Sequence, residues 1–225
     1  LSPDGKLAYV ACQWSGRLLV VDIEAGMVRR EVVIGAEPVA VLVHPTGRAV
    51  YVSAYQSQEV VRLPLFEDGL PDESKALRVH TTDRPFGLAL DGSGQSLYVT
   101  RFLLQPGYDE VDAETLKLER AMDFADEQAQ GHRLLAHGVP RGVYQAAVRP
   151  SLTPDASGAG ELWLPHLLLA TDTAQPDLDF ESTVFPALSV RGASGERRAV
   201  LSTASSRPGI GGRLAETGGG PRAGA

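Results

Sequence analysis

One short pattern, a glycine followed four positions later by Tyr-Val, occurs three times near the start of the chain. The glycines are Gly5, Gly47 and Gly94, which lie 42 and 47 residues apart. A repeat of about 40 to 50 residues is the length of one four-stranded blade of a β-propeller and is too long for a leucine-rich repeat. The period therefore predicts a series of four-stranded units.

The residues between these motifs are typical of four strands per unit. Residues 39–43, Val-Ala-Val-Leu-Val, form an apolar run that suits an inner strand buried on both faces by neighbouring units. The Pro-x-Gly or Pro-Asp-Gly group that follows favours a tight turn, because Pro fixes φ and Gly accepts positive φ. Tyr-Val then begins the second strand. Residues 18–23 predict a third strand, and residues 28–34 predict a half-exposed outer strand.

A fourth, more divergent unit starts near Gly142. Residues 144–148 predict its inner strand, and residues 161–164 stand at the Tyr-Val position. Residues 183–190 and 197–201 predict its third and fourth strands, although Pro186 removes a ladder donor from the third.

The predicted fold class is all-β, a partial β-propeller forming an open arc of about four four-stranded antiparallel blades. The blades are predicted at residues 1–37, 38–84, 85–139 with an insertion, and 140–202. Seven of the last 23 residues, 203–225, are Gly and almost none is large and apolar, so this tail is expected to be disordered. Because the first blade lacks most of its inner strand, we expect sequence upstream of residue 1 and exposed sheet edges in this segment alone.

Composition limits the classes of partner that the chain can bind. The net charge is −7 and the isoelectric point about 5.2, which argues against nucleic acid, whose phosphates are bound by clustered Lys and Arg. No apolar run reaches the length of about 18 residues that a membrane span needs. Cys12 is the only cysteine, so neither an intrachain disulfide nor a C-x-x-C-H haem attachment motif is present.

An insertion separates the third and fourth units. The step from Tyr98 to Trp163 is 65 residues, and the surplus falls around residues 124–141, which are rich in Asp, Glu, Gln and His. Because loops on one face of a propeller often form the binding surface, we expect a protein or small-molecule ligand on this loop face. A solvated insertion without a role is the alternative.

Three polar residues are candidates for ligand or loop-face contacts, namely Arg101, His166 and Asp172. Arg101 stands where the first two units have Cys12 and Ala54, so it predicts either an anion contact in the loops or a structural salt bridge. His166 follows a Trp-Leu-Pro sequence at the end of a strand, and Asp172 comes shortly after it. The five histidines do not have zinc-site spacing. We therefore predict no catalytic, cofactor-binding or metal-binding residue in this segment.

The spacing of Pro3-Asp4-Gly5, Tyr9-Val10 and Val20-Val21-Asp22 resembles the YVTN β-propeller repeat. The resemblance covers roughly residues 1 to 202, and it implies a bacterial or archaeal surface, periplasmic or redox-associated protein.

A narrower resemblance is carried by residues 97–102, 110–116, 163–165 and 178–184. They look like bacterial YVTN propellers carried on the same chain as a dihaem cytochrome c peroxidase-like module. This resemblance implies an extracytoplasmic location in the periplasm or at the cell surface. It also implies haem c in another part of the chain, so that the full-length protein would be a haem-dependent oxidoreductase.

The leading functional hypothesis is a non-catalytic binding scaffold. One alternative is a lactonase-like or dehydrogenase-like propeller enzyme, whose active groups would converge from several blades. Another is a structural surface-layer repeat protein, which predicts long arrays of similar blades instead of a haem module.

Overall fold

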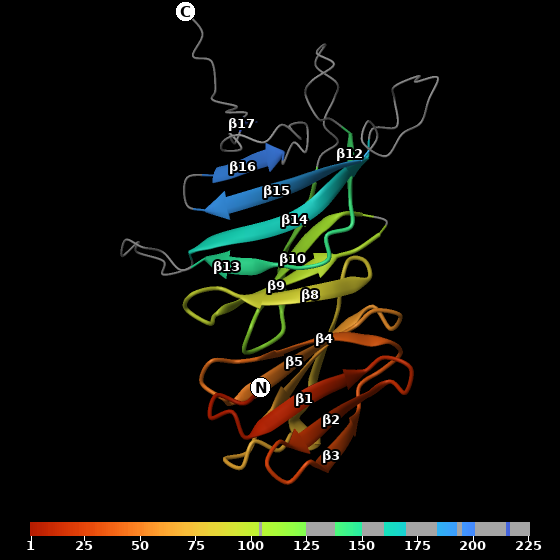
Figure 1. The fold of residues 1–225 in the computed structure, drawn as a ribbon, viewed down its shortest axis with the longest axis vertical. Helices are drawn as coiled ribbons and strands as arrows, with labels where there is room; N and C mark the ends of the chain where they lie inside the picture. The colour runs from red at the N-terminus through yellow and green to blue at the C-terminus, as the bar shows by residue number, and fades with distance from the viewer. Residues whose placement is uncertain are drawn as a thin grey trace, which may run out of the picture.

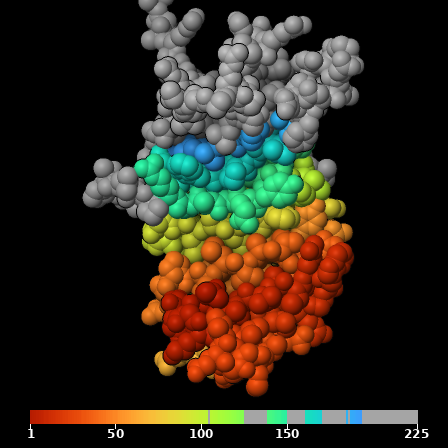
Figure 2. Space-filling view, viewed as in Figure 1, coloured from red at the N-terminus to blue at the C-terminus, as the bar shows by residue number. Residues whose placement is uncertain are grey.

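The computed structural model describes residues 1–103, 105–124, 138–149, 160–169, 184–192, 195–200 and 215–216. Over these residues the chain is all-β apart from one 3-10 turn, η1 (Glu73–Lys75). Its strands form four antiparallel sheets that follow one another in sequence order along the longest axis (Figures 1 and 2). The predicted all-β arc of four antiparallel blades is therefore confirmed.

Within each of the first three blades, strands that are neighbours in the sheet are also neighbours in sequence. The first consists of β1 (Leu7–Cys12), β2 (Arg17–Asp22) and β3 (Met27–Val33). The second consists of β4 (Pro38–Val43), β5 (Ala49–Ala54), β6 (Glu59–Pro64) and β7 (Leu77–His80). The third consists of β8 (Pro85–Leu90), β9 (Ser96–Arg101), β10 (Gly107–Asp112) and β11 (Leu118–Asp123). Among the described strands, only β2 pairs with β1, so the first blade has no inner strand in this segment.

The repeated glycines make the turns that the sequence predicts. Gly5, Gly47 and Gly94 have φ angles of 74°, 71° and 76°, a region that residues with a Cβ rarely occupy. Neighbouring turns also contact each other, because His44 Nε2 lies 3.2 Å from the carbonyl oxygen of Gly94. His44 is thus a polar residue with a structural partner.

The core lies between the blades rather than within them. All six residues of β5 are buried, and the period of two along a strand sends alternate side chains to opposite faces. Val50 and Val52 pack against the first blade, whereas Ala49 and Tyr51 pack against the third. A further cluster, including Ala89, joins the third and fourth blades. Each blade is therefore stabilised by its neighbours.

The fourth blade differs from its prediction at the inner strand. Two short strands, β12 (Val139–Arg141) and β13 (Ala147–Arg149), replace the single strand expected at residues 144–148. Both pair with β14 (Glu161–Leu169), at opposite ends of it. The interruption has a local cause, because Gly142 adopts φ 65° and its carbonyl accepts the Tyr144 N–H. That turn takes the intervening residues out of the ladder.

Two prolines fit this broken ladder. Pro165 lies in the stretch of β14 that neither β12 nor β13 covers, so its missing N–H removes no bond on that edge. Pro186 lies in β15 (Val184–Gly192), one residue before the pairing with β16 (Gly195–Val200) begins. A third strand containing Pro186 is therefore compatible with the sheet.

The described part of the predicted tail is short. Residues 215–216 form β17 (Ala215–Glu216), which pairs with β16. The other residues from 203 onward, and so most of the segment predicted to be disordered, lie outside the described residues.

Candidate functional site

The register of the sheets places one set of loops at a common end of the arc. Pro38, the first residue of β4, is opposite Ala54, the last of β5, and Pro85 at the start of β8 is opposite Arg101 at the end of β9. Each inner strand therefore begins where the second strand of its blade ends. We call this the loop end, and its described residues are 13–16, 34–37, 55–58, 81–84, 102–103 and 105–106.

Four aromatic side chains meet at the loop end, and we call them the aromatic cluster: Tyr55, Phe86, Phe102 and Tyr144. The ring centroids of Phe102 and Tyr144 are 4.6 Å apart, and those of Phe86 and Phe102 are 5.0 Å apart. Tyr55 meets Phe86 edge-to-face at 6.1 Å, and Phe86 meets Tyr144 in the same way at 5.7 Å. These separations are those of favourable aromatic pairs. The cluster joins the second, third and fourth blades.

The repeat positions of three of the four residues explain why their rings lie at the loop end. Tyr55 and Phe102 each directly follow the second strand of their blade, and Phe86 is the second residue of β8. Tyr144 reaches them because Gly87 lets the fourth blade approach, since a Cβ there would lie 2.5 Å from the Tyr144 carbonyl oxygen. Tyr144 is 48% exposed, whereas the other three rings are half-buried. The cluster therefore combines a fixed arrangement with an accessible ring.

A cation borders the cluster. The guanidinium carbon of Arg84 lies 5.3 Å from the centroid of the Tyr55 ring, within the range of a cation–π interaction. Hydrogen bonding to the Tyr55 side chain, together with the nearby Asp83 and Glu37 carboxylates, raises the pKa of Arg84 above its ordinary value. Arg84 is therefore charged at every physiological pH.

Arg101, a sequence-predicted candidate, lies beneath the loop end and is fully buried. Its Nε is 3.4 Å from Oδ1 of Asp109, also fully buried, and its Nη2 is 2.7 Å from Oδ1 of Asp123. Gly107 has no side chain to obstruct the bond from Nη2 to the Met122 carbonyl. Burial raises the pKa of Asp109. Arg101 and Asp109 therefore form a buried structural ion pair, which the exposed Asp123 joins from the surface.

The other two candidates do not join the aromatic cluster. His166 is buried in β14, with its Nδ1 3.0 Å from the Leu164 carbonyl oxygen and its ring 4.9 Å from that of Phe124. Asp172 lies outside the described residues, as do positions 125–137 of the insertion. The sequence analysis therefore missed the aromatic cluster, although aromatic residues directly after the second strand in two consecutive repeats were a usable signal.

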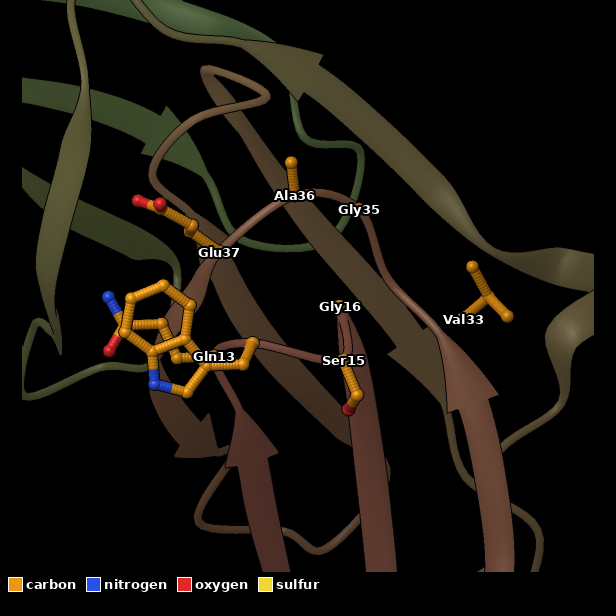
Figure 3. Close-up of a pocket in the computed structure, with 8 residues that line it drawn as sticks. Gln13, Ser15, Gly16, Val33, Gly35, Ala36 and Glu37 are labelled. Carbon is orange, nitrogen blue, oxygen red and sulfur yellow. The ribbon is translucent and has the colours of Figure 1, made fainter.

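A second feature of the loop end is a shallow pocket of about 390 Å³ between the first and second blades. Its walls are the β1–β2 turn and the link from β3 to β4, residues 13–16, 33 and 35–37. Trp14 in this turn is 90% exposed. Figure 3 shows Gln13 and Glu37 on one side of the pocket and Val33 on the other. Polar groups and an open indole thus face the same solvent space.

Two further observations concern the described residues as a set. They contain no group of three or more His, Cys, Asp or Glu side chains arranged to hold a metal ion. None of their helices has the length and apolar character needed to cross a membrane.

Neither a protein-family model nor a curated protein matches this sequence. Solved structures do match. Kuenenia stuttgartiensis hydrazine synthase is 15% identical with a TM-score of 0.54, over 90% of this chain and 64% of that one. The dihydro-haem d1 dehydrogenase NirN, in complex with DHE, is 15% identical with a TM-score of 0.52, over 89% of this chain and 42% of that one.

A third similar structure is a functionally unknown protein from Desulfotomaculum acetoxidans, which is 11% identical with a TM-score of 0.53, over 97% of this chain and 70% of that one. The chain thus spans less than two thirds of the length of the first two proteins. At these identities the likeness concerns the fold alone. It shows that this chain is similar in fold to β-propeller proteins, some of them enzymes.

Proposed function

We propose that this chain is a non-catalytic binding scaffold that holds a protein partner at its loop end. The observation that carries the proposal is the aromatic cluster, in which three successive blades contribute four rings whose contacting pairs have centroids 4.6 to 6.2 Å apart. Aromatic residues dominate the energetics of protein interfaces because they bury large areas at low entropic cost. Tyr144, 48% exposed, is the anchor, and the half-buried rings hold it in position.

The proposed setting is an extracytoplasmic, redox-associated bacterial protein with a haem c module on the same chain. Its support is the sequence resemblance to YVTN propellers of that kind. The fold-level likeness to NirN, which was solved in complex with DHE, is compatible with the same setting. In such a protein this segment supplies the docking surface, and the redox chemistry belongs to the haem module.

Site-specific photocrosslinking in the native host tests the proposal. A benzophenone amino acid replaces Tyr144, and in a control strain it replaces Val28, which is 55% exposed on the outer strand of the first blade. We expect one predominant protein to crosslink from position 144 and not from position 28, with loss of that product in Phe102→Ser. Identical products from both positions would contradict the proposal.

An activity panel on the complete gene product separates the scaffold from a propeller enzyme. The scaffold proposal predicts no lactone hydrolysis above background, and it predicts peroxidase turnover only when haem is bound. Lactone turnover in haem-free protein that is lost in Tyr144→Ser would overturn it.

A further inference from the structure

Equivalent positions of consecutive repeats carry different charges at the loop end. Glu37 and Arg84 each immediately precede the proline that begins an inner strand, Pro38 in β4 and Pro85 in β8. Between the second and third blades, Arg84 supplies the cation that lies over Tyr55. Between the first and second blades, Glu37 occupies the position of Arg84, the residue equivalent to Tyr55 is Gln13, and Trp14 is the next residue of the same turn. The second interface pairs a cation with an aromatic ring, whereas the first has an indole and a carboxylate at the same pocket.

The Trp14 and Glu37 side chains make no direct hydrogen bond, ion pair or ring contact among the described residues. Trp14 is 90% exposed, and no hydrogen bond, ring contact or cation–π contact involves its side chain there. Glu37 is half-buried, and its carboxylate makes no hydrogen bond or ion pair within the described ranges. Both groups line the same pocket of about 390 Å³. A half-buried glutamate and an exposed indole therefore lie at the same pocket.

Backbone geometry fixes Glu37 in this place. Its φ is 56°, a left-handed conformation that few non-glycine residues adopt. The Tyr55 N–H donates a hydrogen bond of 2.9 Å to the Glu37 carbonyl, which ties the link to the second blade. Such conformations persist only where the surroundings hold them, and they gather at ligand-binding positions.

We propose that the pocket lined by Trp14 and Glu37 binds the cationic side chain of a Lys or Arg residue of a partner protein. The indole is the strongest cation–π partner among the aromatic side chains, and the carboxylate supplies a charge-assisted hydrogen bond. The chain's net charge of −7 favours the approach of a basic segment. The inference rests on the proposed scaffold function and gives its partner a chemistry.

The surrounding charges are compatible with this ligand. Arg17, at the start of β2, is already paired with Glu31, with Nη1 and Oε1 2.6 Å apart. Arg84 is near enough for Glu37 to influence it, but no ion pair within 4.0 Å joins the two residues. An incoming cation therefore finds the Glu37 carboxylate open to a direct contact.

Titration of the full 225-residue chain with capped pentapeptides tests the inference. The probes carry a central Arg or its uncharged isostere citrulline, and methylguanidinium serves as a free small cation. Binding is read from the indole N–H resonance of Trp14, assigned with Trp14→Phe because the chain has two tryptophans. We expect saturable binding of the Arg peptide, with affinity at least about threefold above that of the citrulline peptide. Equal affinity for the two peptides, or for methylguanidinium and the Arg peptide, would overturn the inference.

Variants identify the site. Glu37→Gln and Trp14→Leu are each expected to weaken binding of the Arg peptide by about threefold to tenfold. Glu24→Gln is the matched control, because it makes the same charge change on an exposed residue at the other end of the first blade. An equal loss in Glu24→Gln would show general electrostatics and overturn the site. Failure of peptide binding alongside retained crosslinking from position 144 would refute the cation pocket alone.

Discussion

The hydroxyl of Tyr51 in the second blade donates a hydrogen bond of 2.9 Å to the carbonyl oxygen of Ala113 in the third. Tyr9 makes the corresponding bond, of 2.7 Å, from the first blade to Gly69 of the second. The tyrosine of the repeat therefore links each of these blades to the next. Since the core also lies between blades, cooperativity along the arc depends on such interfaces.

Tyr51→Phe tests this link. Removing a buried hydroxyl leaves the Ala113 carbonyl without its partner, so we expect a loss of about 1 to 2 kcal/mol in the free energy of unfolding. Urea denaturation followed by circular dichroism measures it. Tyr98→Phe is the control, because Tyr98 occupies the same repeat position and its hydroxyl makes no hydrogen bond among the described residues. Equal losses in the two variants would contradict the assignment.

Gly87→Ala tests the close approach of the third and fourth blades. The added Cβ would lie 2.5 Å from the Tyr144 carbonyl oxygen and 2.8 Å from the Gln145 Cα, so the blades must separate. We expect destabilisation of about 1 to 3 kcal/mol and a changed near-ultraviolet signal from the aromatic cluster. The second blade has Ala40 at the equivalent position, and Ala40→Gly should leave that signal unchanged. A near-ultraviolet spectrum unaltered in Gly87→Ala would show that no close contact exists.

A double-mutant cycle tests the buried pair of Arg101 and Asp109. Arg101→Met leaves the Asp109 carboxylate buried without its counter-ion, so it is expected to cost about 3 to 5 kcal/mol of unfolding free energy. Adding Asp109→Leu removes that charge, and the double variant should regain part of the loss, as measured by denaturant unfolding, because Asp109 also accepts a hydrogen bond from the Thr82 N–H. Strict additivity of the two substitutions would mean that the residues do not interact.

The pH dependence of stability has a defined sign at Asp112. Hydrogen bonds from the side chain and backbone of Thr115 lower the pKa of Asp112 below its ordinary value. A carboxyl group with a lowered folded-state pKa stabilises the protein above its unfolded-state pKa, and that contribution disappears as pH falls through the folded value. Asp112→Asn should therefore be less stable than the parent at pH 7, and the gap should narrow toward pH 3. Urea midpoints at both values measure it, with Glu24→Gln as the control, and a gap that widens in acid would contradict the assignment.

The repeat made the backbone of the first three blades predictable from sequence. Gly47, for example, has the positive φ that its turn requires, because local turn chemistry alone sets that conformation. The inner strand of the fourth blade was predicted at residues 144–148, yet the ladder is interrupted there. A turn at Gly142 takes residues 142–146 out of the ladder, and its effect depends on where the partner strand β14 lies.

The candidate site was much less predictable. Arg101 was singled out for its charge, and the structure places it below the surface beside Asp109. Tyr55, Phe86 and Tyr144 were not singled out, because their contacts arise between blades and no local pattern records them. Repeat positions show which residues share an end of the arc, whereas packing between blades decides which of them touch.

The most direct test of the central claim uses the protein that photocrosslinking captures. Its affinity for the purified chain is measured. Isothermal titration calorimetry compares the parent with Tyr144→Ser and with Val28→Ser, which removes an exposed apolar side chain far from the loop end. Loss of an aromatic anchor predicts an affinity at least about thirtyfold lower for Tyr144→Ser, with no change for Val28→Ser. Equal affinity of all three proteins would contradict the claim that the aromatic cluster is the docking surface.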